Sequence, residues 1–326
     1  MYKRGDIRHI YGKGEREMIV TVTMNPAIDK TVDITHLEKG DLNRIKRVEM
    51  DAGGKGINVS KTIKALGGTS IATGFIGGNS GTIIKNVLWD LGITTDFVTV
   101  EGETRTNLKV VEDKGDVTEL NEPGPQVTAG QLEELICRLE GYAAKDTLFV
   151  LAGSIPAGVP KDVYRIITER VHEKGAMVLL DADGELFSES LKASPDMLKP
   201  NRLELERHFE MDYRASEKEL VGLGERLMEG GASMAAISLG QMGALFLTRD
   251  KRYRCQGLKV KAHSTVGAGD AMVAAMAYGW DRKLPLEDCI RICMGVSAGA
   301  VTTIGTKPPS RELVDELAAQ AELTEI

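Results

Sequence analysis

The chain has 326 residues, with 41 Lys and Arg against 48 Asp and Glu, so its formal net charge is −7. This mild acidity argues against a general nucleic-acid binder, which carries a basic excess, but it leaves room for a small basic pocket. Hydrophobic residues make up 42% and charged residues 27%, the balance of a folded globular protein. No apolar run reaches the ~18 residues that cross a membrane. We therefore expect neither a nucleic-acid partner nor a membrane partner.

The N-terminal segment and the cysteines indicate the compartment. Residues 1–17 lack the apolar stretch of a signal peptide, and we expect them to form a disordered extension ahead of a domain spanning 18–326. The four cysteines form no CxxC pair and no disulfide framework. This usage fits a reducing compartment, so we predict a cytoplasmic protein.

Strands and helices are predicted to alternate along most of the chain. The β-branched run at 18–24 predicts the first strand. Similar apolar runs predict strands at 69–76, 146–152, 176–181, 197–199 and 233–239, and helical patterns lie at 57–66, 80–92, 128–142 and 160–175. Thr128 suits a helix N-cap and Pro160 suits a first turn. This order predicts a parallel sheet that is covered by helices on both faces.

Two segments depart from this rhythm. Residues 28–50 and 97–121 alternate apolar with polar side chains, and VVEDKGDVTEL (110–120) predicts a hairpin at Lys114 and Gly115. Strands with one polar face suit a small, partly solvated sheet outside the main layer. Because no linker or internal repeat is found, we expect one domain with a small β-sheet lid.

A glycine-rich turn leads directly into an apolar helix at STVGAGDAMVAAMAYGW (264–280). The free N–H groups at such a helix start form an anion site, and Asp270 stands at this positive end. Its carboxylate has two interpretations. It is either a stabilising charge at a helix N-terminus or a general base beside a bound phosphate.

Three other motifs are ambiguous when taken singly. DAGGKGINVSKTIKALGG (51–68) opens a helix with a glycine turn, but it lacks both GxxxxGK[ST] and GxGxxG, which weakens a Walker or Rossmann interpretation. LKPNRLELE (198–206) spaces Asn201 and Glu204 either for ordering water around Mg²⁺ or for a charged helix start. ISLGQMGA (237–244) suits backbone approach to a ligand or a simple hairpin.

In this order, TMNPAID (23–29), GGKGIN (53–58), KPNRLE (199–204), SLGQMGA (238–244) and TVGAGD (265–270) resemble the PfkB carbohydrate kinases of the ribokinase-like superfamily. The resemblance spans Met18 to about residue 320. It implies a three-layer α/β/α fold with a mostly parallel central sheet and a β-sheet lid. It also implies ATP as co-substrate, Mg²⁺ as cofactor, and a homodimer joined through the lids.

The resemblance assigns roles to matching positions. It makes Asp270 the catalytic base and gives the backbone anion hole to Gly267, Ala268 and Gly269. The ATP-binding positions, which include Gly269, are Lys199, Asn201, Ser238, Leu239, Gly240, Gln241, Met242, Gly243 and Ser297, and Asn201 with Glu204 organises Mg²⁺ through water. The sugar-binding positions are Asp29, Gly53, Gly54, Asn58 and Ser154.

By resemblance, Arg105 binds the substrate's phosphate, and Arg44 and Lys55 are weaker candidates for the same role. The structural alternative for Arg105 is an ion pair with Glu103. Many relatives carry an acidic residue where this chain has Ser264, which puts a metal role for that position in doubt.

The implied reaction is transfer of the ATP γ-phosphoryl to the C6 hydroxyl of fructose 1-phosphate, which gives fructose 1,6-bisphosphate. Tagatose 6-phosphate and fructose 6-phosphate are the alternative ketohexose phosphate acceptors. A catalytically dead sugar-phosphate-binding module is the alternative that is not an enzyme, and the retained Asp270 and glycines count against it.

Overall fold

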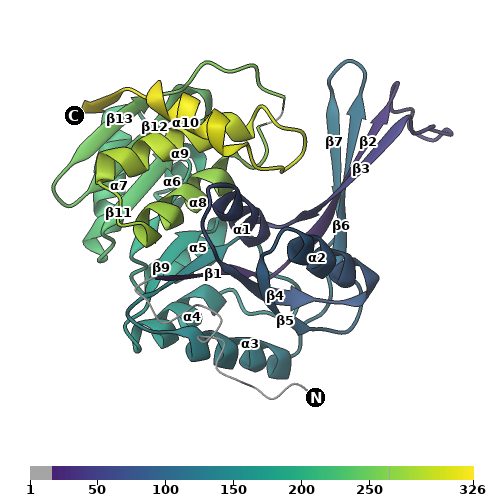
Figure 1. Ribbon diagram of the computed structural model, residues 1–326, viewed down its shortest axis with the longest axis horizontal. Coiled ribbons are helices and arrows are strands. Elements are labelled where there is room, and N and C mark those ends of the chain that lie inside the picture. Colours follow the sequence, from purple (N-terminus) through teal and green to yellow (C-terminus); the bar gives the residue numbers. More distant parts are fainter. Residues whose placement is uncertain (1–16, 264) are drawn as a thin grey trace.

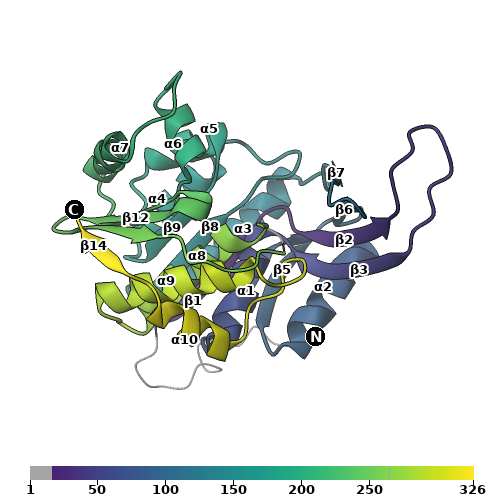
Figure 2. The same ribbon diagram turned by 90° about the horizontal axis from the view of Figure 1, so that it is seen from above.

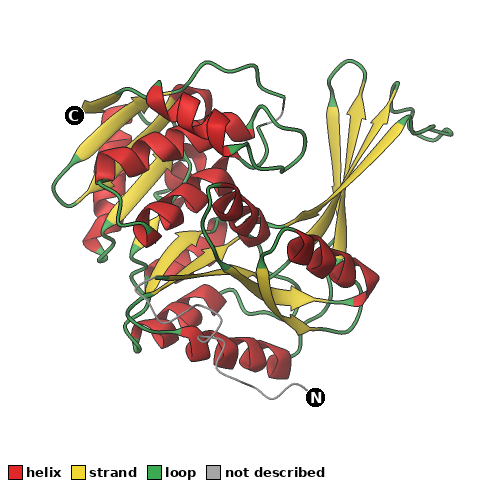
Figure 3. Cartoon of the chain, viewed as in Figure 1, coloured by secondary structure: helices red, strands yellow, loops and turns green. Residues whose placement is uncertain are grey.

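The computed structural model describes residues 17–263 and 265–326. Residues 1–16 of the predicted extension, and Ser264, lie outside the described residues. A large sheet is covered by helices on both faces, and a second, smaller sheet projects beside it (Figures 1 and 3). This is the mixed α/β architecture that the sequence predicts.

The large sheet has ten strands in the order β14-β13-β12-β11-β10-β9-β8-β1-β4-β5. The seven strands from β11 to β5 are parallel, and β12, β13 and β14 are antiparallel. The strands are β1 (Met18–Thr23), β4 (Ile71–Ile76), β5 (Thr94–Thr99), β8 (Thr147–Ala152), β9 (Met177–Asp181), β10 (Met197–Leu198), β11 (Met234–Ser238), β12 (Gly243–Thr248), β13 (Arg252–Gln256) and β14 (Leu323–Glu325).

The helices form two layers because alternate residues of each parallel strand face opposite sides of the sheet. Phe149 and Leu151 pack under α3 to α7, whereas Leu148 and Val150 pack under α1, α8, α9 and α10. Figure 2 shows α5, α6 and α7 on one side of the large sheet and α1, α9 and α10 on the other. The helices are α1 (Lys55–Ala65), α2 (Gly78–Asp90), α3 (Ala129–Tyr142), α4 (Val163–His172), α5 (Gly184–Leu191), α6 (Arg202–His208), α7 (Glu217–Glu229), α8 (Ala268–Asp281), α9 (Leu286–Ala300) and α10 (Arg311–Ala319).

The six strands and four helices predicted from pattern are all present. Thr128 caps α3 through a reciprocal capping box with Gln131, as expected. Pro160 differs, because α4 begins only at Val163, whose N–H donates to the Pro160 carbonyl. Pro160 therefore lies in the turn that leads to α4 rather than in its first turn.

The small sheet has the order β3-β2-β6-β7 and is built from both alternating segments. Its strands are β2 (Ala27–Ile34), β3 (Arg47–Gly53), β6 (Arg105–Glu112) and β7 (Val117–Asn121). The predicted hairpin joins β6 to β7, with Gly115 at φ +91°. The predicted segment 97–121 starts too early, because residues 97–99 belong to β5. Phe97 and Val98 face opposite sides of the sheet and are both buried there, whereas Thr99 at the strand end is exposed.

We predict that Gly74→Ala will separate β4 from β1. Gly74 has φ +137°, and its Cβ would lie 1.9 Å from the Thr23 carbonyl oxygen in the paired strand. The loss in unfolding free energy should reach about 2 kcal/mol or more in urea denaturation. Gly222 in α7 has open space around its Cβ position, so Gly222→Ala should instead stabilise by about 0.5–1 kcal/mol. Equal stability of the two variants would contradict the strand geometry.

Candidate active site

A cavity of about 400 Å³ lies between the carboxyl ends of the central strands and the small sheet. Its walls come from both sheets and from the first turns of α1 and α8, so segments far apart in the sequence meet there. Seven of the sequence-predicted residues line it together: Asp29, Gly54, Lys55, Asn58, Arg105, Ser154 and Asp270.

Asp270 lies in the first turn of α8, with Gly267 as the left-handed N-cap at φ +87°. The side chain is buried, and Asn58 Nδ2 donates to its Oδ2 at 2.8 Å. Burial, and next the nearby Asp181 carboxylate, raise the pKa of Asp270 to about 6, against the opposing effects of Asn58, Lys55 and Lys199. The carboxylate is therefore ionised at neutral pH and is basic enough to accept a proton from a hydroxyl.

Asp181 is a site residue that the sequence analysis missed. It ends β9 and is 1% exposed. Its Oδ1 lies 3.3 Å from both Lys55 Nζ and Lys199 Nζ. Burial alone would raise the pKa of Asp181, but the two lysines outweigh it and lower that pKa. Nothing local in VLLDADG marks this aspartate, because its partners lie far away in the sequence.

The wall of the cavity that the small sheet forms is organised around Asp29 in β2. Gly53 gives it room, because a Cβ on Gly53 would lie 2.1 Å from Asp29 Oδ2. In the neighbouring strand β6, Asn107 Nδ2 donates to Asp29 Oδ1 at 3.1 Å. Burial raises the pKa of Asp29. The pair presents a carboxylate and an amide, which are suited to sugar hydroxyls.

Arg105 begins β6 and lines the same cavity. Two of its N–H groups donate to main-chain carbonyls, at 3.0 Å to Asn25 and at 3.4 Å to Glu122. Its Nε is buried and has no partner among the described residues. Glu103 does not pair with it, because that carboxylate accepts the backbone N–H groups of Asn79 and Ser80. Arg105 is therefore a half-buried cation with unused N–H donors, and it lines the cavity.

Arg44 is not brought to this cavity. It is exposed in the connection between β2 and β3, beyond the paired residues of those strands. Lys109, which the sequence analysis missed, lines the cavity instead. It shares a face of β6 with Arg105 because strand residues two and four apart point the same way. This two-residue alternation along the strand was the sequence signal that could have identified Lys109. The ammonium is held loosely, 3.9 Å from Glu119 Oε1.

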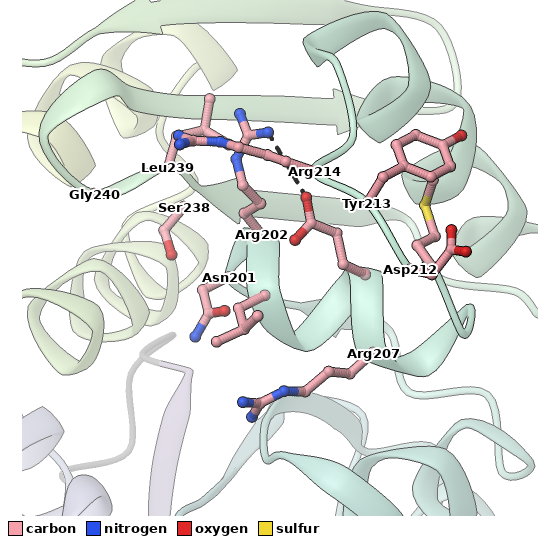
Figure 4. Close-up of a pocket in the computed structure, with 12 residues that line it drawn as sticks. Asn201, Arg202, Arg207, Asp212, Tyr213, Arg214, Ser238, Leu239 and Gly240 are labelled. Carbon is pink, nitrogen blue, oxygen red and sulfur yellow. Dashed lines mark ion pairs between the residues drawn. The ribbon is translucent and has the colours of Figure 1, made fainter.

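A second hollow of about 510 Å³ lies on the α6 side of the β10 and β11 ends (Figure 4). Asn201, Ser238, Leu239 and Gly240 of the predicted nucleotide set line it. A short 3₁₀ turn (Gly240–Met242) follows β11, with Gln241 and Met242 exposed and Gly243 at φ +100°. The Ser297 hydroxyl on α9 is buried without a partner among the described residues.

Lys199 follows β10 and reaches the first turn of α8, where its Nζ lies 3.3 Å from the position that a Cβ on Gly269 would take. Asn201 and Glu204 form a reciprocal capping box on α6: Glu204 N donates to Asn201 Oδ1 at 2.9 Å, and Asn201 N donates to Glu204 Oε2 at 2.7 Å. This is the helix-start arrangement that we weighed as the alternative. The second Glu204 oxygen takes no part in that box, and burial raises the pKa of this carboxyl.

Within residues 17–263 and 265–326, no cluster of three or more His, Cys, Asp or Glu is arranged to hold a metal ion. Over the same residues, no helix combines the length and the apolar character that crossing a membrane requires.

Comparison with known proteins places this arrangement among sugar kinases. A family profile described as "pfkB family carbohydrate kinase" matches residues 22–313. The 1-phosphofructokinase of Bacillus subtilis (strain 168) is 36% identical over 309 residues, which cover 95% of this chain and all of that protein. The D-tagatose-1-phosphate kinase of Bacillus licheniformis is 32% identical, with the same coverage. A tetrameric inhibited form of phosphofructokinase-2 from Escherichia coli superposes with a TM-score of 0.87 at 25% identity, covering 93% of this chain and 99% of that one.

We predict that Asn58→Ala will raise the pKa of Asp270 further above its ordinary value. The amide of Asn58 donates to the ionised carboxylate, so its removal favours the neutral acid. Titration of the Asp270 carboxyl by ¹³C NMR would measure the shift. Asn79→Ala, at the distant start of α2, should leave the titration unchanged. A lower pKa in the Asn58 variant would contradict the contact.

Proposed function

Because the chain belongs to the pfkB family of carbohydrate kinases, we propose that it transfers the γ-phosphoryl of ATP to the C6 hydroxyl of fructose 1-phosphate, giving fructose 1,6-bisphosphate and ADP. The observation that carries the proposal is the meeting of Asp270, at the start of α8, with Arg105 in one cavity. The first is a base of raised pKa, and the second is a cation with no carboxylate partner among the described residues.

Phosphoryl transfer needs alignment, neutralisation of developing charge and a base for the attacking hydroxyl. In our proposal Asp270 accepts the proton of the C6 hydroxyl. The N–H groups in the first turn of α8, at Gly267 to Gly269, stabilise the charge on the transferred group. Lys55 and Lys199 add two ammonium groups beside that turn. The small sheet excludes water, which would otherwise compete as the acceptor.

Mg²⁺ would enter with ATP and would supply charge neutralisation between the phosphates. The oxygen donors of Asn201 and Glu204 are of the kind that Mg²⁺ prefers, and one Glu204 oxygen stays outside the capping box. Mg²⁺ usually keeps several waters, which fits contact through water rather than a cage of protein ligands. The nucleotide would follow the turn Ser238–Gly243 toward Ser297.

The substrate's phosphate would lie at the lid end of the cavity, where Arg105 has unused donors. In an acidic chain, about two added negative charges need local cations. Asp29 with Asn107 would orient the sugar hydroxyls, with Gly53 and Gly54 allowing close approach and Asn58 and Ser154 at the cavity edge. ATP use and four free cysteines support a cytoplasmic enzyme.

The relative named D-tagatose-1-phosphate kinase makes tagatose 1-phosphate a second candidate substrate. Tagatose differs from fructose only in the configuration at C4. Both sugar phosphates carry a C1 phosphate at one end and a C6 hydroxyl at the other. Either one could therefore place its phosphate at Arg105 and its hydroxyl at Asp270. In our proposal, the contacts of Asp29 and Asn107 with the sugar hydroxyls, including the one at C4, decide between the two substrates.

We also propose a homodimer joined through the small sheets. Val48 and Leu120 are 48% and 57% exposed, and they lie on the sheet face turned away from Asp29 and Lys109. Burying an apolar sheet face of this kind away from water is favourable, and a second copy of the chain offers an identical face that can bury it.

Purified protein should turn over fructose 1-phosphate with the highest kcat/KM in an assay of ADP release. The panel should include tagatose 1-phosphate, tagatose 6-phosphate, fructose 6-phosphate and free fructose.

Asp270→Asn serves as the background control and should lower kcat by about 10²–10⁴-fold while ATP binding is kept. Preference for a tagatose phosphate moves the protein to that function. Near-normal kcat in the Asp270 variant removes it as the base.

Arg105→Ala should raise KM for fructose 1-phosphate by about ten- to a hundredfold and leave KM for ATP little changed. This size corresponds to the loss of a hydrogen bond to a charged group. Arg249→Ala, in the exposed turn between β12 and β13, is the matched control and should behave as wild type. If both KM values rise together in the Arg105 variant, its role is structural.

Light scattering at micromolar concentration should give twice the chain's mass of 35.3 kDa. Val48→Glu combined with Leu120→Glu should give monomers, because two carboxylates would be buried in the interface. A tetramer, or a dimer that survives the double substitution, would contradict the proposed contact surface.

A further inference from the structure

Asp181 carries a buried charge that neither the resemblance nor the proposed function uses. It lies at the carboxyl end of β9, in register with Ala152 of β8, near the middle of the large sheet. Its side chain is 1% exposed, and its Oδ2 has no hydrogen-bond partner among the described residues. An unpaired buried carboxylate is strongly unfavourable, so its cations decide whether it is tolerated.

The two cations come from opposite halves of the site. Lys55 begins α1 and lies on the sugar side, next to Gly153, whose Cβ would lie 3.5 Å from Lys55 Cβ. Lys199 follows β10 and lies on the nucleotide side, against the first turn of α8. A single oxygen, Asp181 Oδ1, is 3.3 Å from both ammonium nitrogens. Without it, two like charges, one buried and one partly exposed, would lie close together and repel each other.

We propose that Asp181 is a positioning residue that holds Lys55 and Lys199 together at the junction of the sugar and nucleotide halves and sets the charge felt by Asp270. Its role rests on the proposed phosphoryl transfer. The transferred group must pass between the two halves, and the two ammonium groups are fixed at that crossing by one carboxylate. Asp181 itself touches no reacting atom.

The protonation behaviour of the cluster agrees with this arrangement. Asp181 raises the pKa of Asp270, second only to burial, whereas Lys55 and Lys199 lower it. Burial alone would lower the pKa of Lys55, but the carboxylates of Asp181, Asp270 and Glu204 raise it. Lys55 and Lys199 act on both Asp181 and Asp270, and Asn58 acts on Asp270. Asp181 in turn raises the pKa of the neighbouring Glu204 and Tyr164.

The sign of the charge effect follows directly. Replacing Asp181 with Asn removes a negative neighbour of Asp270 and leaves two ammonium groups without their counter-charge. Both changes favour the ionised form of Asp270, so its pKa must fall. The acid limb of the pH–rate profile, which reports protonation of the base, should therefore move to lower pH. A purely structural role would leave that limb in place.

Two variants of Asp181 and one control test the proposal. Asp181→Asn should lower kcat by about ten- to a hundredfold, because two charge-assisted contacts are lost, and should move the acid limb to lower pH. Asp181→Glu keeps the charge but displaces it by a methylene group, so kcat should fall while the limb stays. Asp196→Asn is matched to the first variant at the opposite end of the strands, where Asp196 accepts from His172 and the Val178 N–H. It should change neither kcat nor the limb.

¹³C NMR titration of Asp270 in the free protein separates this proposal from the proposed function. If wild type phosphorylates no ketohexose phosphate, the function fails, and the titration still reports whether Asp181 controls Asp270. Wild-type kcat in Asp181→Glu overturns the positioning role. An unmoved Asp270 titration in folded Asp181→Asn overturns the charge role. Should that variant not fold in thermal melts, the Asp181→Glu result decides.

Discussion

A carboxylate buried at the carboxyl end of a parallel sheet is stable only when cations reach it, and Asp181 has two. These ion pairs fix the first residue of α1 and the residue after β10 relative to β9. Because α1 and α8 pack against each other on one face of the sheet, the same contacts place Asn58 against Asp270. The chemistry of the cavity depends on this small group of buried charges.

The buried state of Asp270 has a cost that a purely structural residue would not need. Its pKa of about 6, against 3.8 for an ordinary aspartate, means that burial and the Asp181 carboxylate disfavour the ionised form more than Asn58, Lys55 and Lys199 favour it. An aspartate at a helix N-terminus can serve that helix at the surface without this cost. A carboxylate kept ionised near neutral pH, beside free helix N–H groups, favours an enzyme over a binding module on the same fold.

The small sheet supplies a row of polar side chains along its strands, which the large sheet does not. The large sheet is buried on both faces, so its strands offer polar groups only at their ends. The strands of the small sheet have one polar face, and that face presents Asp29, Arg105, Asn107 and Lys109 along two neighbouring strands. Its other face carries the exposed apolar Val48 and Leu120, so the proposed substrate contacts and the proposed dimer contact use opposite faces of the same strands.

Local sequence determined much of this protein. The β-branched run at the start, the Thr128 cap, the turn at Gly115 and the glycine turn before Asp270 are encoded by a few neighbouring residues, because propensity and turn chemistry act over short distances. The five motifs, in their order, were enough to indicate the family and contain five residues that meet in the cavity, while Arg105 and Ser154 were assigned by the wider resemblance.

Tertiary structure decided the remainder. Asp181 and Lys55 are 126 residues apart, and nothing beside either one announces the pair. Phe97 and Val98 look two-faced locally, but both are buried because they pair with β4. Arg44 was a cation expected from sequence, whereas strand alternation puts Lys109 on the same face as Arg105 and the pairing of β6 with β2 places that face at the cavity. Contacts between distant segments depend on strand order and register, which single-residue patterns do not encode.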